Sequence, residues 1–280
     1  MKNYIDLLKI FGIKFYFPNF VTNETQHIQE YATANKPSNS KISINQNKKI
    51  AKNFVDKVQN YSLNKKIISK NLEQLDSETN DLINLIRNQI LNINSLEKLK
   101  QYVLDFQYCK LKFFAKNTVF SDGNAQNPKI MVIGEAPGEK EDLQGKPFCG
   151  RSGILLDKIL LAINLSRDTN SYITNTVFWR PPANRRPTQT EIEICKPIVE
   201  KHIAIIKPNF ILLTGNTAIK SLLSSDVQIS NFQGKIMSYN NMYLENSINL
   251  SAIFHPSYLL RQASKKKETW KSLLQIQKFL

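Results

Sequence analysis

The stretch from Lys129 to Gly153 limits what this chain can fold into more than any other part of its sequence. Residues Ile130 to Ile133 form a continuous apolar run that favours β-structure, which is typical of a strand buried on both faces of a parallel sheet. The run stops at Gly134, and an acidic loop follows before helical periodicity resumes after Gly153. Ligands of open α/β sheets bind at the carboxyl ends of strands, so this loop is a candidate site. The residues placed there are Glu135, Glu141, Asp142 and Phe148. The alternative is that the glycines of this loop only form a tight turn.

Three further β-rich runs follow, and helical patterns separate them. The expected strands cover residues 171–179, 209–214 and 250–254, and the expected helices cover residues 152–163, 190–206, 216–223 and 266–280. Thr188 and Glu191 resemble a capping box at the start of the second of these helices. Such alternation gives a parallel sheet with helices on both faces. The predicted fold class is therefore α/β, with three α/β/α layers around a central four-stranded parallel sheet whose distinctive strand ends meet at one edge.

The N-terminal third is predicted to be an extension of the main domain. The polar stretch at about residues 21–49 has linker composition, because it cannot bury enough apolar surface to offset the entropy lost on ordering. Helical patterns are expected at residues 2–12, 50–58, 72–90 and 96–108. We therefore expect a helical and partly disordered extension over residues 1–90 and one main domain over residues 91–280.

The composition narrows the classes of partner. A formal charge of +15 and a pI near 9.6 favour polyanions, because basic side chains that neutralise phosphates release counterions. The alternative is that the lysine and asparagine content only reflects AT-rich codons. No run approaches the roughly 18 apolar residues of a membrane span. A cytoplasmic, monomeric protein without membrane contact is expected. Three cysteines are too few for a disulfide framework.

Four sequence blocks occur in order at the expected strand ends, namely GEAPGEKED, KPFCGRSG, TNTVFWRPPANRRP and HPSYLLR. Together they resemble the motifs of the family 4 uracil-DNA glycosylases, over a span from about Leu96 to the C-terminus. The resemblance implies a uracil-DNA glycosylase-like fold for the main domain. It also implies a hydrolase that flips deoxyuridine out of DNA and cleaves its N-glycosidic bond in base excision repair. The implied partner is uracil-containing DNA, single- or double-stranded.

The resemblance further implies which residues hold the base. Phe148 resembles the aromatic residue on which the flipped uracil stacks, since a flat apolar face replaces the stacking lost on extrusion. Asn175, at the end of the second strand, is similar to the residue that reads the uracil edge. Its amide can donate to O4 and accept from N3–H, whereas cytosine presents the opposite pattern. The alternatives are that Phe148 fills the core and that Asn175 caps a turn.

Two residues carry the implied chemistry. His255 looks like the histidine that faces uracil O2, where a donor stabilises the negative charge on the leaving base. Glu135 and the backbone of Ala136 resemble the wall nearest the water and the sugar, where a carboxylate can orient water. Glu141 resembles the residue near uracil C5, where bulk excludes the methyl group of thymine. For Glu141 and Asp142 the alternative is a solvated acidic loop, and for His255 it is a structural histidine.

The HPSYLLR segment looks like the loop that enters the minor groove of DNA. Leu259 is expected to be the wedge that fills the vacated base stack, as apolar wedges do at kinked base steps. Several cations are expected to reach phosphates, with solvated surface charge as the alternative for each. They are Arg180, Arg185, Arg186, Arg261 and the lysines of residues 265–267.

The sequence departs from the family at its metal site. Relatives of this family usually bind a [4Fe–4S] cluster through four cysteines, and those positions here are Phe106, Cys109, Trp179 and Cys195. A cluster of this kind takes four thiolates, which aromatic side chains cannot supply. We expect no cofactor and a vestigial site in which Phe106 and Trp179 fill the cluster's space, so that the four residues lie close together.

Other functions are possible on the same fold. A non-catalytic DNA-binding or polymerase-associated module is the alternative to an active glycosylase, and the altered cysteine set motivates it. A binder of nucleotide phosphates is a third hypothesis. It is disfavoured because the sequence contains neither a Gly-x-Gly-x-x-Gly motif nor a Walker-type loop.

Overall fold

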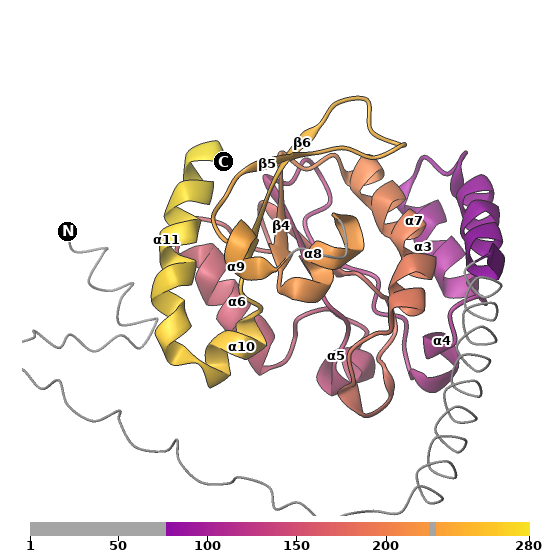
Figure 1. Ribbon diagram of the computed structural model, residues 1–280, viewed down its shortest axis with the longest axis horizontal. Helices are drawn as coiled ribbons and strands as arrows, with labels where there is room; N and C mark the ends of the chain where they lie inside the picture. Colours follow the sequence, from indigo (N-terminus) through magenta and orange to yellow (C-terminus); the bar gives the residue numbers. More distant parts are fainter. Residues whose placement is uncertain (1–76, 224–227) are drawn as a thin grey trace, which may run out of the picture. The chain divides into compact units, whose positions relative to one another are not determined.

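A computed structural model describes residues 77–223 and 228–280, and the expectations for the first helix, the linker and the helix at 50–58 lie outside these residues. The described residues form a six-stranded sheet in the order β1-β3-β2-β4-β6-β5 (Figure 1). Its four central strands are parallel, namely β3 (Ser171–Asn175), β2 (Ile130–Gly134), β4 (Phe210–Thr214) and β6 (Ile248–Ile253). The predicted α/β class and its parallel centre are confirmed.

The predicted strand count was too low by two. Strands β1 (Asp122–Gly123) and β5 (Met237–Tyr239) add antiparallel edges beside β3 and β6. Both are too short to show a period-two pattern, and Gly123 has no side chain to contribute. The second predicted strand was too long, since β3 ends at Asn175 rather than at Trp179.

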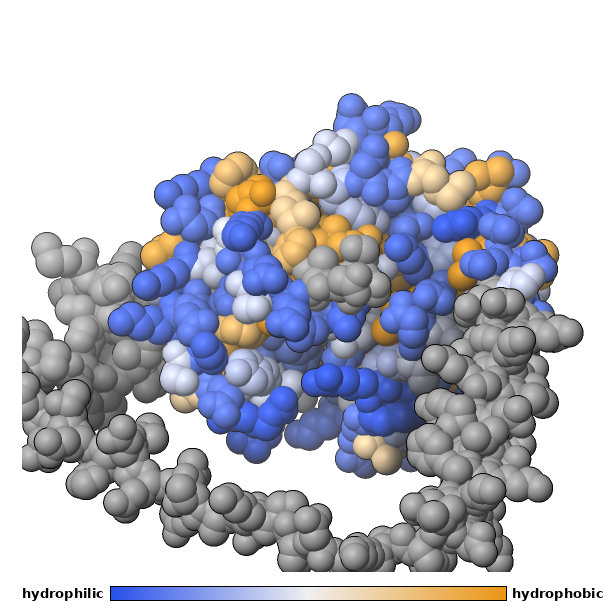
Figure 2. Space-filling model, viewed as in Figure 1, coloured by the Kyte–Doolittle hydropathy of each residue, from blue (hydrophilic) through white to orange (hydrophobic). Residues whose placement is uncertain are grey.

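Helices cover both sides of the sheet. In Figure 1, α6 and α11 lie on one side of the strands, and α3 and α7 lie on the other. The described helices of the main domain are α3 (Leu96–Asp105), α4 (Leu111–Phe114), α5 (Glu139–Gln144), α6 (Arg151–Leu161), α7 (Gln189–Ile206), α8 (Asn216–Leu222), α9 (Ile229–Phe232), α10 (Pro256–Arg261) and α11 (Lys266–Ile276). Among these, α4, α5, α9 and α10 were not predicted, and the six residues of α5 lie inside the acidic loop. Figure 2 shows that hydrophilic residues cover most of the visible face.

The start of α7 confirms the predicted capping box. The backbone N–H of Glu191 donates to Thr188 Oγ1 at 3.3 Å, and the backbone N–H of Thr188 donates to Glu191 Oε2 at 2.7 Å. These two bonds satisfy N–H groups that the first turn of a helix leaves without a partner. The cap therefore fixes where the loop after β3 gives way to α7.

The core follows from the apolar runs of the sequence. All residues of β2 and β4 are buried, as expected for strands covered on both faces. Residues 77–90 are helical, and Ile86 and Ile90 are fully buried. The division into residues 1–90 and 91–280 stays a prediction, because residues 1–76 lie outside the described chain. No helix in the described ranges is both long enough and apolar enough to cross a bilayer.

Candidate active site

The carboxyl ends of the parallel strands meet at one edge of the sheet, as predicted. The register pairs Gly134 with Asn175 and Thr214 with Ile253, so the residues that follow these pairs lie side by side. A cavity of about 300 Å³ opens there. It is lined by Glu135, Ala136, Glu141, Phe148, Asn175 and His255, together with parts of the loops around them. All six residues predicted to hold the base or to act on its sugar therefore line one cavity, which is named the base cavity after this predicted role.

Phe148 forms one wall of this cavity. Its side chain is 5% exposed, and its ring stacks on that of His255 with centroids 5.6 Å apart. Its backbone has φ of +52°, a left-handed conformation that is uncommon for a residue with a side chain. Gly134 lies directly against the ring, since a Cβ there would come within 2.5 Å of two ring atoms. The absence of a side chain at Gly134 is thus what makes room for the aromatic wall.

Asn175 lies at the floor of the cavity, where β3 ends. It is 1% exposed, and its Nδ2 has no hydrogen-bond partner among the described residues. A buried amide N–H without a partner is costly, so such a group in a native structure calls for a ligand or a water. Its Oδ1 would come within 2.3 Å of a Cβ at Gly134, which places the amide beside the same glycine as the Phe148 ring.

His255 is the N-cap of α10, and its ring lies against that of Phe148 in the lining of the cavity. Its Nδ1 accepts a hydrogen bond from the backbone N–H of Ser257 at 3.2 Å, and Ser257 Oγ lies 2.8 Å from the same nitrogen. Because Nδ1 is an acceptor, the neutral ring carries its proton on Nε2. Burial, followed by the positive charge of Arg261, lowers the pKa of His255 to about 4. Sequence reasoning missed Ser257, although it stands in the same HPS motif.

Glu135 follows β2 and is held at two points. Its carboxylate Oε2 accepts a hydrogen bond from Thr217 Oγ1 at 2.5 Å, and its backbone carbonyl accepts one from Thr176 Oγ1 at 2.5 Å. Thr176 directly follows β3, and Thr217 lies in α8 three residues after the end of β4; these two strands flank β2 in the sheet. Sequence reasoning named neither, although their positions after predicted strands were a usable signal. Glu135 also lines a second cavity of about 490 Å³, which contains His255 and Arg261 as well.

Glu141 and Asp142 are not part of a solvated acidic loop, so that alternative is wrong for both. Glu141 is 9% exposed, and Asp142 is 2% exposed. The carboxylate of Glu141 accepts backbone N–H bonds from Gly138, Cys149 and Gly150 at 2.8–3.1 Å. Asp142 Oδ1 accepts the backbone N–H groups of Lys116 and Asn117 at 2.9 and 3.0 Å. Both side chains therefore hold loops in place, and Glu141 does so while lining the base cavity.

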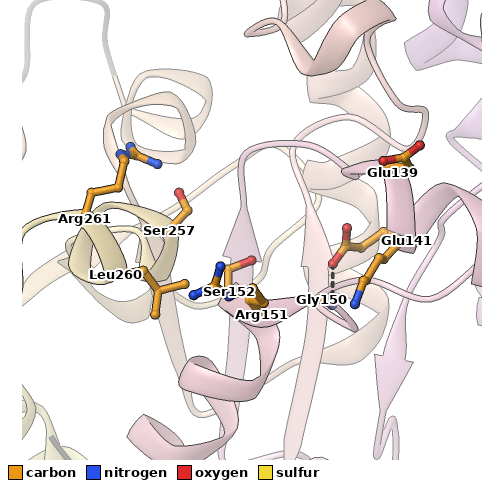
Figure 3. Close-up of a pocket in the computed structure, with 9 residues that line it drawn as sticks. Glu139, Glu141, Gly150, Arg151, Ser152, Ser257, Leu260 and Arg261 are labelled. Atoms are coloured by element: carbon orange, nitrogen blue, oxygen red, sulfur yellow. Dashed lines mark hydrogen bonds between the residues drawn. The ribbon is translucent and has the colours of Figure 1, made fainter. Parts of the chain in front are cut away.

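A groove of about 420 Å³ adjoins the base cavity between α5, α6 and α10 (Figure 3). It shares Glu141, Ser152, Ser257 and Arg261 with the base cavity.

Arg261 lines the groove and both cavities. Arg185 lines the base cavity, but its guanidinium pairs with Glu191 at 2.6 Å. Arg186 lines the second cavity, whereas Arg180 bonds Asn184 Oδ1 at 2.8 Å and Lys265 pairs with Glu268 at 2.6 Å.

The prediction for Leu259 was wrong. The HPSYLLR segment forms helix α10 rather than a loop, and this helix turns Leu259 inward, where its exposed fraction is 0%. A side chain buried in the protein cannot insert into DNA. The neighbouring Leu260 is 42% exposed and lines the groove in Figure 3.

The four family cluster positions lie close together, as predicted. The rings of Phe106 and Trp179 stack with centroids 5.7 Å apart and planes 10° from parallel. The thiols of Cys109 and Cys195 form a hydrogen bond, which together with burial raises the pKa of Cys195 well above its ordinary value. In residues 77–223 and 228–280, no group of three or more His, Cys, Asp or Glu side chains could hold a metal. Two thiols and two rings do not fit a cluster that needs four thiolates.

Comparison with known proteins agrees with this geometry. Residues 120–275 match the model of the Uracil DNA glycosylase superfamily. The chain is 38% identical over 180 residues to the type-4 uracil-DNA glycosylase of Sulfurisphaera tokodaii, covering 62% of this chain and 80% of that protein. It is 39% identical over 153 residues to the enzyme of the same name from Saccharolobus solfataricus, covering 53% and 70%. It is also 28% identical over 152 residues to a DNA polymerase of Bacillus phage SP01, covering 54% of this chain and 16% of the polymerase. The chain therefore belongs to the uracil DNA glycosylase superfamily, and within it to the type-4 family.

Proposed function

We propose that this protein is a uracil-DNA glycosylase that flips deoxyuridine out of DNA and hydrolyses its N-glycosidic bond in base excision repair. The observation that carries the proposal is the buried Asn175 amide. Its Nδ2 has no partner among the described residues, and it shares a cavity with the Phe148 ring and the His255 imidazole. Burying an unpaired amide is costly, and a ligand that pairs with it accounts for its place in this cavity.

Base recognition divides between Phe148 and Asn175. The Phe148 ring supplies an apolar face that replaces the stacking lost when the base leaves the duplex. The Asn175 amide donates from Nδ2 to uracil O4 and accepts N3–H at Oδ1. Cytosine presents a donor and an acceptor in the reverse order, so it would leave both amide atoms unpaired. Glu141 closes the side of the cavity that faces C5, where thymine carries a methyl group.

Bond cleavage depends on His255. As the glycosidic bond breaks, the electron pair stays with the base, and negative charge gathers at uracil O2. The Nε2–H of the neutral imidazole donates to that oxygen, while Ser257 holds Nδ1 on the other side of the ring. A preorganised donor of this kind needs no reorganisation during the reaction.

Glu135 is assigned to the sugar side. Its negative carboxylate stabilises the oxocarbenium-like sugar and orients the water that attacks C1′. Thr217 fixes one oxygen of that carboxylate, and Ala136 completes the wall. The hydroxyl of the water stays on C1′ of the sugar, and the proton that the water gives up neutralises the uracil anion.

DNA lies along the groove and the second cavity. The cations assigned to phosphates are Arg261 and Arg186. Arg261 lines the groove and both cavities, and Arg186 lines the second cavity. Arg185 and Arg180 have protein partners and contribute less, because an existing ion pair or hydrogen bond must be given up. Leu260 takes the wedge role in place of Leu259. Both single- and double-stranded uracil DNA are candidate substrates.

The enzyme is proposed to work without an iron–sulfur cluster. Two thiols and two stacked rings occupy the family's ligand positions. Protein purified without oxygen should be colourless and contain no stoichiometric iron. A brown preparation with about four irons per chain would contradict this part of the proposal.

Cleavage of a uracil-containing oligonucleotide tests the function. Wild-type protein should release uracil, while Asn175→Ala and His255→Ala should each slow release by about 100-fold or more. Lys235 lines neither the groove nor either of the two cavities. The Lys235→Ala variant therefore serves as a control and should keep wild-type activity. Failure of pure wild-type protein to release uracil from either form of DNA would sink the proposal.

The match to a phage DNA polymerase favours one second candidate, a polymerase-associated DNA-binding module without catalysis. Under that hypothesis the protein binds DNA, and uracil adds nothing to its affinity. Under the glycosylase hypothesis, the His255→Ala variant should bind uracil-containing DNA more tightly than the same DNA with thymine in place of uracil. That difference in affinity would rule out the non-catalytic module.

A further inference from the structure

We propose that Arg167 is a positioning residue for uracil excision, which holds the Phe148 platform in place from outside the base cavity. The inference rests on the proposed function, because Phe148 matters only as a surface for the base. Arg167 lies in the connection between α6 and β3. It is not among the described residues that line the base cavity, so its effect on the base must pass through other groups.

The Phe148 loop needs external support. A residue other than glycine with φ of +52° is strained, and such a conformation persists only where the surroundings determine it. Gly153 in α6 adds a second constraint, since a Cβ there would come within 1.7 Å of the Phe148 carbonyl oxygen. The loop is thus pressed closely against the start of α6, and its carbonyls need donors.

Arg167 supplies those donors. Its Nη2 donates to the Phe148 carbonyl at 2.6 Å, and its Nη1 donates to the Pro147 carbonyl at 3.0 Å. The same guanidinium pairs with Asp122 Oδ2 at 2.9 Å and with Asp157 Oδ1 at 2.7 Å. Its side chain is only 17% exposed. The planar guanidinium has five donors in a fixed arrangement, so four partners fix its position in space.

The other side of the loop is held by Glu141. Its Oε1 accepts the backbone N–H groups of Cys149 at 3.0 Å and Gly150 at 2.8 Å. The carbonyls of residues 147 and 148 therefore face a cation, and the amides of residues 149 and 150 face an anion. Each bond is charge-assisted, which makes it shorter and stronger than a neutral hydrogen bond. These two clamps fix the backbone on both sides of Phe148, and the backbone sets the direction in which the ring leaves the chain.

A double-mutant cycle tests the inference, with Arg167→Met, Phe148→Ala and the double variant. Arg167→Met should slow single-turnover excision by about 10- to 100-fold, because misplacement of a binding surface by about 1 Å costs this much. In the Phe148→Ala background the same change should cost no more than about twofold, since its target is gone. Binding to DNA with a tetrahydrofuran abasic site, which lacks a base, should stay within about twofold of wild type. If Arg167→Met fails to fold, Arg167→Lys takes its place, because one ammonium nitrogen cannot reach all four partners.

Asp157→Asn is the matched control. It removes one ion pair of the guanidinium but neither bond to the loop, so excision should stay within about threefold of wild type. Losses that multiply in the double variant, or equal losses in abasic-site binding, would overturn the inference. If the wild-type protein releases no uracil, the proposed function is refuted instead. In that case a crystal structure of Arg167→Met still decides, since Phe148 should leave its left-handed conformation.

Discussion

Gly134 shows how one missing side chain shapes the whole base cavity. The residue ends β2, and a Cβ at this position would come within 2.3 Å of Asn175 Oδ1 and 2.5 Å of the Phe148 ring. Both groups that are proposed to recognise the base therefore rest against the same residue. Because Phe148 comes from the loop before α6 and Asn175 from the end of β3, no single rotation of either side chain relieves both contacts.

Gly134→Ala should consequently slow uracil excision by about 100-fold, since both recognition groups must move. The free energy of unfolding should fall by about 1–3 kcal/mol, the usual cost of an overpacked core position. Single-turnover rates and urea unfolding measure the two effects. Gly145→Ala is the control, because a Cβ there meets no described atom within 4 Å, although its φ of +68° makes alanine strained. Near wild-type excision by Gly134→Ala would contradict the assigned cavity.

The lowered pKa of His255 predicts the acid side of the pH profile. Its folded pKa of about 4 lies below the ordinary value of 6.5, so the ring stays neutral from pH 7 down to that value. Protonation at lower pH places a proton on Nδ1, which then faces the N–H of Ser257. Excision by wild type should therefore hold its rate through pH 6.5 and fall as pH approaches 4.

Single-turnover rates at saturating enzyme measure this fall of the excision rate at acid pH. The His255→Gln variant should not show it. A wild-type rate that halves near pH 6.5 would show that the imidazole is not shielded. The same shift affects stability. Between pH 6.5 and about 4, His255 is protonated in the unfolded chain but neutral in the folded one. The free energy of unfolding therefore falls as the pH drops below 6.5, by up to about 1.4 kcal/mol per pH unit.

Residue types at strand ends could be predicted from the sequence, but the partners that orient them could not. Phe148, Asn175 and His255 meet because parallel strands bring their carboxyl ends to one edge. Whether Glu141 faces solvent or clamps a backbone depends on side-chain rotamers, which carry no signal in sequence spacing. The same limitation applies to Thr217, whose hydroxyl could have bonded many neighbours.

At the scale of elements, α10 determines which leucine can reach DNA. The sequence predicted a loop after β6, and an extended loop leaves either leucine free to point outward. Pro256 at the first position of a helix and His255 as its N-cap instead start a helix of six residues. A helix turns neighbouring side chains about 100° apart, so Leu259 faces the core and Leu260 faces the groove.

Leu259 and Leu260 should therefore respond in opposite ways to alanine substitution. Leu259→Ala should lower the free energy of unfolding by about 2–5 kcal/mol, as for other buried leucines. Leu260→Ala should change it by less than about 0.5 kcal/mol, but slow excision from double-stranded DNA. Single-stranded DNA has no stack to fill, so its cleavage by Leu260→Ala should match wild type. Equal slowing on both substrates would argue against a wedge.

Elements differ in how well sequence predicts them for a physical reason. Strands β2 and β4 are buried on both faces, so each appears as a continuous apolar run, whereas the buried residues of β3 and β6 include polar ones. Strand β1 is two residues long and is held by pairing with β3, which no local pattern encodes. Helix α5 likewise forms because its loop is anchored, through Glu141 and Asp142, to backbone on either side.

At the scale of the whole molecule, the stack of Phe106 on Trp179 lies at two of the four positions that the family resemblance assigns to cluster-binding cysteines. Phe106 follows α3, Trp179 lies beyond β3, and Cys195 lies on α7, so the site joins three separate parts of the chain. The Trp179 Nε1–H donates to Thr118 Oγ1 at 3.0 Å, which satisfies the one polar atom of the ring. The missing cysteines were visible in the sequence. That stacked rings would fill the space was a hypothesis, because packing geometry cannot be derived from residue types.

Trp179→Ala should therefore destabilise the fold by about 3–5 kcal/mol, the range for large aromatic residues removed from cores. The ring is 1% exposed and contacts both Phe106 and Phe178. Its removal therefore leaves a cavity between the three segments. Urea unfolding of the intact chain measures the change, and Phe113→Ala serves as a control because that ring is 69% exposed. The control should stay within about 0.5 kcal/mol of wild type. A loss below about 1 kcal/mol for Trp179→Ala would mean that something other than this stack joins the three segments.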